Sequence, residues 1–140
     1  MATPALTGSC GCGAVQFEID EPLVGAAYCH CTRCQRRTGG GASVSALMKP
    51  GSLRITQGED KLKAWEPEGG FAKTFCSECG SALFGGPPGE GHTIVRMGVI
   101  DGDPGVRPVA RQFVAYAAPW EPIPDDGLRR FDESLPSPRD

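Results

Sequence analysis

Short alternations of apolar and polar residues run through most of the chain and predict a fold built from β-strands. Residues 14–20 and 42–48 alternate residue by residue, which is the pattern of a strand with one buried face. The same reasoning predicts further strands at residues 23–28, 53–56, 62–65, 71–75, 81–84, 93–99 and 111–116. Turn-forming residues separate these segments, and no stretch shows sustained helical periodicity. We therefore expect a mainly β fold of antiparallel sheets.

The two ends of the chain carry weaker patterns than its middle. We expect residues 1–6 to form a loose terminus. The stretch from residue 121 onward is rich in proline and aspartate, and one helical turn is expected around residues 128–131. A length of 140 residues suits one domain. We expect residues 1–140 to form that single domain, with a core near residues 8–120 and a C-terminal tail over 121–140.

Composition and charge narrow the range of partners. The 20 glycines and 13 prolines favour a turn-rich β fold over a helical bundle. The formal net charge is −3 and the isoelectric point is near 5.4, whereas a nucleic-acid-binding domain needs a basic face. No apolar run approaches the roughly 18 residues of a membrane-spanning helix, and residues 1–8 lack the features of a signal peptide. We expect a soluble, cytoplasmic protein that binds neither nucleic acid nor a membrane.

The chemistry of the chain is concentrated in its seven cysteines. An odd number of cysteines cannot all pair in disulfides within one chain, and in a reducing cytoplasm clustered cysteines more often bind metal. They form a C-x-C pair, a C-x-C-x-x-C triplet and a C-x-x-C pair, namely Cys10 and Cys12; Cys29, Cys31 and Cys34; Cys76 and Cys79. Such short spacings let a tight turn bring sulfur atoms together about 2.3 Å from a zinc ion. A redox dithiol is the alternative for the C-x-x-C pair, but it belongs at a helix start in a βαβ unit, which is missing here.

The seven cysteines divide naturally into a set of four and a set of three. The two pairs add up to one closed four-sulfur site that would join distant parts of the chain and stabilise the fold. The triplet leaves the fourth tetrahedral position open, as catalytic zinc sites do. Two alternatives remain at this point. Cys76 and Cys79 could complete a site with part of the triplet, or His92 or a carboxylate could close the triplet as a second structural site.

Several residues near the triplet are candidates for binding a substrate. Arg33, Arg36 and Arg37 could hold the carboxylates of an acidic substrate, or form a solvated basic face. His30 lies between two of the cysteines and could help to position substrate, although we expect it to face solvent. Residues 39–41 are three glycines, which allow a ligand to approach the backbone closely or act as a hinge.

At these motifs the sequence resembles the glutathione-dependent formaldehyde-activating enzyme family, also called the GFA or centromere-protein-V-like family. The resemblance rests on residues 8–15, 29–39 and 75–84, and continues weakly to residues 118–120. It implies a β-tent fold of antiparallel sheets with zinc-binding loops, shared with a Rab-binding zinc chaperone. It also implies two zinc ions: a structural one held by Cys10, Cys12, Cys76 and Cys79, and a catalytic, potentially exchangeable one held by Cys29, Cys31 and Cys34.

The activity implied by the resemblance is condensation of formaldehyde with glutathione to S-hydroxymethylglutathione, a carbon–sulfur lyase reaction. A small-molecule thiol such as glutathione is the expected partner. The family often carries a histidine where this chain has Arg111, which suggests a different substrate or a different supporting role at that position. The main rival function is a non-enzymatic, zinc-stapled domain that binds a protein partner. The acidic balance of the chain and the absence of a basic tail argue against a nucleic-acid or cytoskeletal role.

Overall fold

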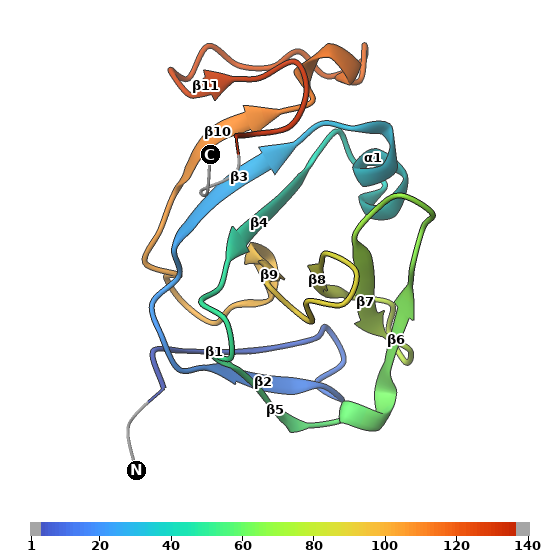
Figure 1. Cartoon of the computed structure of the whole chain (residues 1–140), viewed down its shortest axis with the longest axis vertical. Coiled ribbons are helices and arrows are strands. Elements are labelled where there is room, and N and C mark those ends of the chain that lie inside the picture. Colours follow the sequence, from blue (N-terminus) through green and yellow to red (C-terminus); the bar gives the residue numbers. More distant parts are fainter. Residues whose placement is uncertain (1–3, 137–140) are drawn as a thin grey trace.

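The structure, a computed structural model that describes residues 4–136, consists of two β-sheets and one short α-helix (Figure 1). The smaller sheet is antiparallel and has the strand order β1-β2-β5. Its strands are β1 (Leu6–Ser9), β2 (Gln16–Ile19) and β5 (Leu53–Gln57). Within residues 4–136, no helix is both long and apolar enough to cross a membrane.

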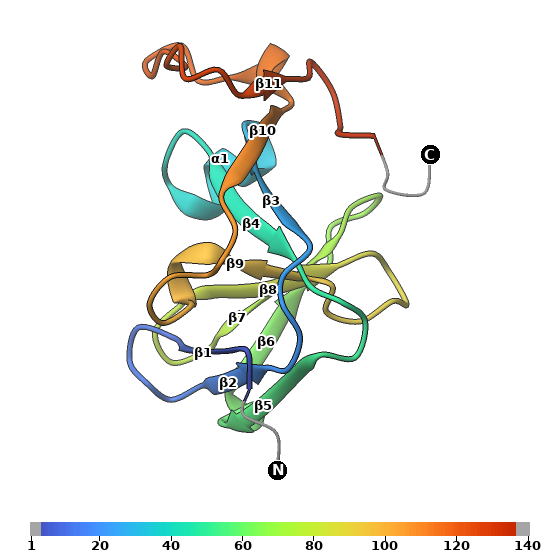
Figure 2. The same cartoon turned by 90° about the vertical axis from the view of Figure 1, so that its left-hand side faces the viewer.

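The larger sheet has eight strands in the order β11-β10-β3-β4-β9-β8-β7-β6. In chain order these are β3 (Gly25–Cys29), β4 (Ser43–Leu47), β6 (Leu62–Trp65), β7 (Ala72–Cys76), β8 (Ala82–Gly86), β9 (Ile94–Arg96), β10 (Pro108–Gln112) and β11 (Arg129–Arg130). The prediction of a mainly β fold is confirmed. The prediction that all pairings are antiparallel is wrong at one edge, because β10 runs parallel to both β3 and β11. The chain crosses from β9 past the small sheet before β10, so β10 runs alongside β3 in the same direction (Figures 1 and 2).

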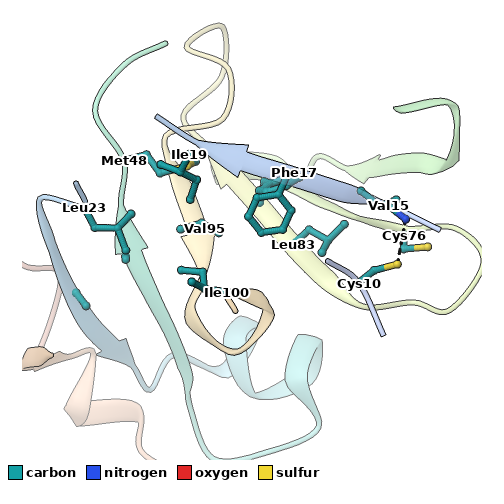
Figure 3. Close-up of a cluster of buried hydrophobic side chains, with 13 residues drawn as sticks. Cys10, Val15, Phe17, Ile19, Leu23, Met48, Cys76, Leu83, Val95 and Ile100 are labelled. Atoms are coloured by element: carbon teal, nitrogen blue, oxygen red, sulfur yellow. Dashed lines mark hydrogen bonds between the residues drawn. The ribbon is translucent and has the colours of Figure 1, made fainter. Parts of the chain in front are cut away.

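The core lies between the two sheets (Figure 3). Val15, Phe17 and Ile19 alternate along β2 and its entry, and all three are fully buried against the larger sheet. Phe17 meets Phe84 of β8 edge-to-face, with ring centroids 5.0 Å apart. Cys10 and Cys76 belong to the same buried cluster. Burial of the apolar face of β2 therefore packs the two sheets together and brings Cys10 and Cys76 into the same part of the core.

One helix was missed, because its sequence carries no hydrophobic period. Helix α1 (Thr32–Thr38) is only seven residues long and is defined by its caps. The Sγ of Cys31 accepts a hydrogen bond from the backbone N–H of Cys34 at the N-terminal end. Gly39 ends the helix with φ of 73°, a left-handed conformation that glycine adopts without strain. The helix is therefore set by the cysteine motif that precedes it and the glycine that follows it.

The two chain ends also differ from expectation. Leu6 and the residues after it form β1, whose pairing with β2 contradicts a loose terminus up to residue 6; residues 1–3 of that expectation lie outside the described part. The helical turn expected near residues 128–131 is wrong, because Arg129 and Arg130 form β11 beside β10. The segment pairs as a strand rather than forming a helical turn, and Phe131 donates its N–H to the carbonyl of Arg111 at 2.9 Å. The residues expected to extend β9 and β10 form 3-10 turns instead, η2 (Met97–Val99) and η3 (Val114–Tyr116).

Candidate metal centres

Four cysteines from two distant hairpins meet at one end of the core. Cys10 and Cys12 lie in the turn between β1 and β2, whereas Cys76 is the last residue of β7 and Cys79 lies in the turn that follows it. Their four Sγ atoms all lie within 4.8 Å of one another. The Cys10–Cys12 and Cys12–Cys76 sulfur distances are 3.7 and 4.0 Å. Sulfurs placed tetrahedrally about 2.3 Å from zinc are about 3.8 Å apart, so this donor set fits a closed zinc site.

The backbone of both turns is shaped to present sulfur. Gly13 and Gly80 have φ of 80° and 79°, and their N–H groups donate to the carbonyls of Cys10 and Cys76 at 3.2 and 2.7 Å. The N–H of Val15 donates to the Sγ of Cys10 at 3.2 Å. Such N–H to sulfur bonds favour the thiolate that a metal requires.

Ser81 ties the two turns together directly. Its Oγ accepts the N–H of Gly11 at 2.9 Å and lies 3.2 Å from the Sγ of Cys79. The hydrogen bond from the Ser81 hydroxyl, supported by backbone donors, lowers the pKa of Cys79 to about 5. A metal held here would join the small sheet to the larger sheet.

The remaining three cysteines meet where β3 passes into α1. Cys29 is the last residue of β3, Cys31 caps the helix and Cys34 lies in its first turn. Their Sγ atoms lie within 4.8 Å of one another, and within residues 4–136 no further His, Cys, Asp or Glu joins this cluster. His92, one candidate to close the site, instead lies against Thr74 and Phe84. The seven cysteines are thus grouped four and three, and Cys76 and Cys79 do not mix with the triplet.

The triplet shares protons among its own thiols and is surrounded by cations. Hydrogen bonds from Cys29 and Cys31 lower the pKa of Cys34, with a further contribution from the charge of Arg96. The same sharing with Cys31 and Cys34 raises the pKa of Cys29. The charges of Arg37 and Lys73 interact with that of Cys34. These cations would offset the negative charge of three thiolates on one divalent metal ion.

An open cleft of about 580 Å³ lies beside the triplet. Cys31 lines it, as do all three arginines proposed from the sequence, Arg33, Arg36 and Arg37. Its other walls are aromatic and come from distant segments: Trp65, Phe113 and Tyr116. Within the described residues, none of these three arginines forms an ion pair with a carboxylate.

The three arginines differ in their solvent exposure and in their contacts with neighbouring residues. Arg36 is exposed, whereas Arg37 lies with its guanidinium 5.4 Å from the centre of the Phe75 ring. Burial, then repulsion from Arg96, lowers the pKa of Arg37. Arg33 packs so closely on Gly70 that a side chain there would overlap it. Arg36 is therefore the arginine best placed to meet a ligand that enters from solvent.

His30 does not face solvent, which corrects the expectation from the sequence. It is 6% exposed, because it packs against the buried side chain of Arg111. Its Nε2 lies 3.2 Å from Nη1 of Arg111. Burial, then the charge of Arg111, lowers the pKa of His30 and keeps the ring neutral. Since Arg111 can only donate, Nε2 of His30 is the acceptor.

Arg111 is itself buried, with 7% exposure. Its guanidinium lies 4.2 Å from the centre of the Tyr28 ring and donates to the carboxylate of Asp126 at 2.7 Å. The sequence indicates the position of Arg111 but not these partners, because Asp126 lies in a segment without a hydrophobic pattern. The aromatic walls of the cleft, Lys73 and Arg96 were missed for the same reason: only the fold brings them to the triplet.

A family model described as glutathione-dependent formaldehyde-activating enzyme matches residues 5–116. A curated protein from Halomonas elongata, whose name gives it provisionally as a glutathione-dependent formaldehyde-activating enzyme, is 32% identical over 88 residues. That alignment covers 56% of this chain and 54% of the relative, so the chain spans about half the length of the curated relative.

A solved structure supports the fold independently. The crystal structure of a Rhodobacter sphaeroides protein from a structural genomics programme matches with a TM-score of 0.58 and 23% identity. The match covers 89% of this chain and 98% of that protein. This likeness concerns the fold alone, whereas the family match extends over most of the sequence. The chain belongs to the glutathione-dependent formaldehyde-activating enzyme family.

Proposed function

We propose that the protein is a zinc-dependent carbon–sulfur lyase that adds a thiol such as glutathione to formaldehyde or a related small electrophile. One observation carries this proposal: a cluster of only three cysteine sulfurs, within the described residues, beside an open, arginine-lined cleft. Cys29, Cys31 and Cys34 are the proposed catalytic ligands. The four-sulfur cluster is the proposed structural site.

A zinc ion bound by the triplet would supply an open coordination position and would lower the pKa of a thiol entering it. The chain's own groups would orient the substrate. Arg36, with Arg33 beside it, can bind the carboxylates of an acidic thiol by charge-assisted hydrogen bonds. Trp65 and Tyr116, which are 46% and 47% exposed, provide aromatic walls against which a substrate can pack. His30 is buried against Arg111 and does not line this cleft, so we assign it to positioning the ligands rather than to touching substrate.

The proposed reaction is balanced without any further reactant. The thiol sulfur forms a bond to the aldehyde carbon, the carbonyl π bond breaks, and the proton lost by the thiol ends on the oxygen. The product is an S-hydroxymethyl thioether, and the reverse reaction cleaves the carbon–sulfur bond. Proximity is the main contribution that the cleft can make, because it holds the thiol and the aldehyde in one orientation.

Replacement of Cys31 by serine tests the proposal. We expect Cys31→Ser to lose formaldehyde consumption with glutathione and to keep the unfolding transition of the wild type, since the triplet joins only β3 and α1. Ser77→Ala, an exposed change in the other metal turn, is the matched control and should stay active. A folded Cys31→Ser protein with full activity would contradict the proposal. A wild type that binds zinc but ignores thiols would favour the rival role of a protein-binding domain.

A further inference from the structure

The C-terminal segment, residues 121–136, lies beyond the part of the chain that the family model matches, residues 5–116. It nevertheless packs along β10 and η3, near the start of α1 (Figures 1 and 2). Its backbone hydrogen bonds to these elements are Phe131 N–H to Arg111 O at 2.9 Å, Val114 N–H to Phe131 O at 3.0 Å and Phe113 N–H to Glu133 O at 2.9 Å. The segment is therefore an ordered part of the larger sheet's edge.

Hydrogen bonds connect this segment to His30, the residue between Cys29 and Cys31, by way of Arg111. Asp126 accepts a hydrogen bond from Arg111 at 2.7 Å, and Arg111 donates in turn to His30 at 3.2 Å. Arg111 is buried, and its Nε has no hydrogen-bond partner within the described residues. The carboxylate of Asp126 therefore provides the main compensation for the buried positive charge of Arg111. Removing the carboxylate would leave a buried cation uncompensated, and the guanidinium would have to turn toward water.

His30 is the residue through which this link meets the sulfurs. Its N–H donates to the carbonyl of Gln112 at 3.0 Å, and its carbonyl accepts from Nε2 of Gln35 at 2.9 Å. Its ring meets Arg111 on one side and the backbone of Gly41 on the other. His30 is thus held at its backbone and at its ring, directly between two members of the triplet.

The same segment also supports the cleft wall and the glycine loop. The hydroxyl of Tyr116 donates to the carboxylate of Glu133 at 2.9 Å, and Tyr116 lines the cleft beside the triplet. The carboxylate of Glu121 packs against Gly41, where any side chain would overlap it. Three separate side chains of residues 121–136, those of Glu121, Asp126 and Glu133, therefore contact residues around the site.

We propose that the C-terminal segment, residues 121–136, supports metal binding at the triplet, and that Asp126 is a positioning residue that acts through Arg111 and His30. It holds the peptide that carries Cys29 and Cys31 in the geometry that binds metal. Metal binding at the triplet and the packing of residues 121–136 on β10 are then thermodynamically linked, so each stabilises the other. This inference rests on the proposed metal binding at the triplet.

The chain offers a matched control for this proposal. Asp103 has the same two kinds of partner as Asp126, an arginine and a backbone N–H two positions on: Arg107 donates to both of its carboxylate oxygens, at 2.8 and 2.7 Å, and the N–H of Gly105 donates at 2.8 Å. Asp126 binds Arg111 at 2.7 Å and the N–H of Leu128 at 3.1 Å. The Asp103 pair is exposed, and none of the bonds described for it reaches the triplet or His30. Asp126→Ala and Asp103→Ala each remove the carboxylate partner of an arginine, and they differ in the burial of that arginine and in its connection to the site.

The experiment measures cobalt(II) binding by the sulfur-to-cobalt absorption bands, with a competing chelator to give dissociation constants. Cys31→Ser identifies which of the two binding phases belongs to the triplet. We expect Asp126→Ala to raise the dissociation constant of that phase about tenfold, the low end of the effect of losing a group that hydrogen-bonds to a metal ligand, because Asp126 acts through Arg111 and His30. The other phase should not change, and Asp103→Ala should leave both unchanged. Cobalt binding at the triplet should also slow amide hydrogen exchange at residues 126–131 in the wild type.

Equal triplet affinities in Asp126→Ala and wild type would overturn the inference while leaving the proposed function intact. A wild type that binds cobalt only at the four-sulfur site would instead refute the metal binding on which both rest. If Asp126→Ala does not fold, Arg111→Lys serves in its place, because lysine keeps the charge but cannot reach Asp126 and His30 together. Unchanged triplet affinity in Arg111→Lys would equally overturn the inference.

Discussion

Replacing Cys76 or Cys79 by serine separates two contributions of the four-sulfur cluster to the free energy of unfolding: the binding of a metal ion, and the burial of an apolar side chain at position 76. Both variants lose one of four sulfurs, but Cys76 is fully buried in the core and Cys79 is exposed. A structural zinc ion contributes about 10–16 kcal/mol of apparent binding free energy, so one ligand accounts for about 3 kcal/mol. A serine hydroxyl at Cys76 is also removed from water in an apolar setting, which costs about 1–3 kcal/mol more.

We therefore expect Cys79→Ser to lower the free energy of unfolding by about 3 kcal/mol and Cys76→Ser by about 4–6 kcal/mol. Domains are typically stable by about 5–15 kcal/mol, so Cys76→Ser should be close to the folding limit. Urea unfolding of the metal-loaded proteins, monitored by circular dichroism, gives both values. Two variants as stable as the wild type would show that this cluster holds no structural metal. Equal losses would refute the burial argument.

Three further predictions concern the cleft, the pH dependence and the core. Arg36→Ala should raise KM for an acidic thiol severalfold and leave kcat and stability nearly unchanged, which steady-state kinetics would measure; an unchanged KM would remove Arg36 from the binding site. Burial lowers the pKa of His92 in the folded protein, so its contribution to stability is complete above pH 6.5 and is lost as the pH falls below that value. The stability of the wild type relative to His92→Gln should thus decrease between pH 7.5 and 5.5 in urea unfolding, and a constant difference would contradict this. Phe17→Ala removes the ring that packs on Phe84 and should cost about 3–5 kcal/mol; a loss under 1 kcal/mol would show that the core collapses around the gap.

Much of the fold could be predicted because its signal is local. The alternation at residues 14–20 gives β2, and that at residues 42–48 gives β4, because a strand with one buried face repeats every two residues. The division of seven cysteines into four and three also follows from sequence, since two turns with matching spacing can close one tetrahedral site. These features depend on neighbours only a few residues apart.

The remaining features depend on contacts that spacing along the chain does not record. Helix α1 forms through its caps rather than through a hydrophobic period, and β11 forms because β10 offers it an unpaired edge. The sequence suggests that His30 is a solvent-facing spacer between two ligands, whereas in the structure it is buried and hydrogen-bonded to Arg111. The parallel pairing of β10 with β3 was equally hidden, because it depends on the route of the chain between them.

Zinc content per chain, measured with and without millimolar glutathione, tests the central claim most directly. We expect two zinc ions per chain, of which the one at the triplet exchanges and is perturbed by glutathione. The Cys31→Ser protein should then keep only the zinc at the four-sulfur cluster. Two zinc ions that exchange with nothing and ignore glutathione would contradict an open thiol-binding site. A single zinc in the wild type, unaffected by the thiol, would contradict metal binding at the triplet.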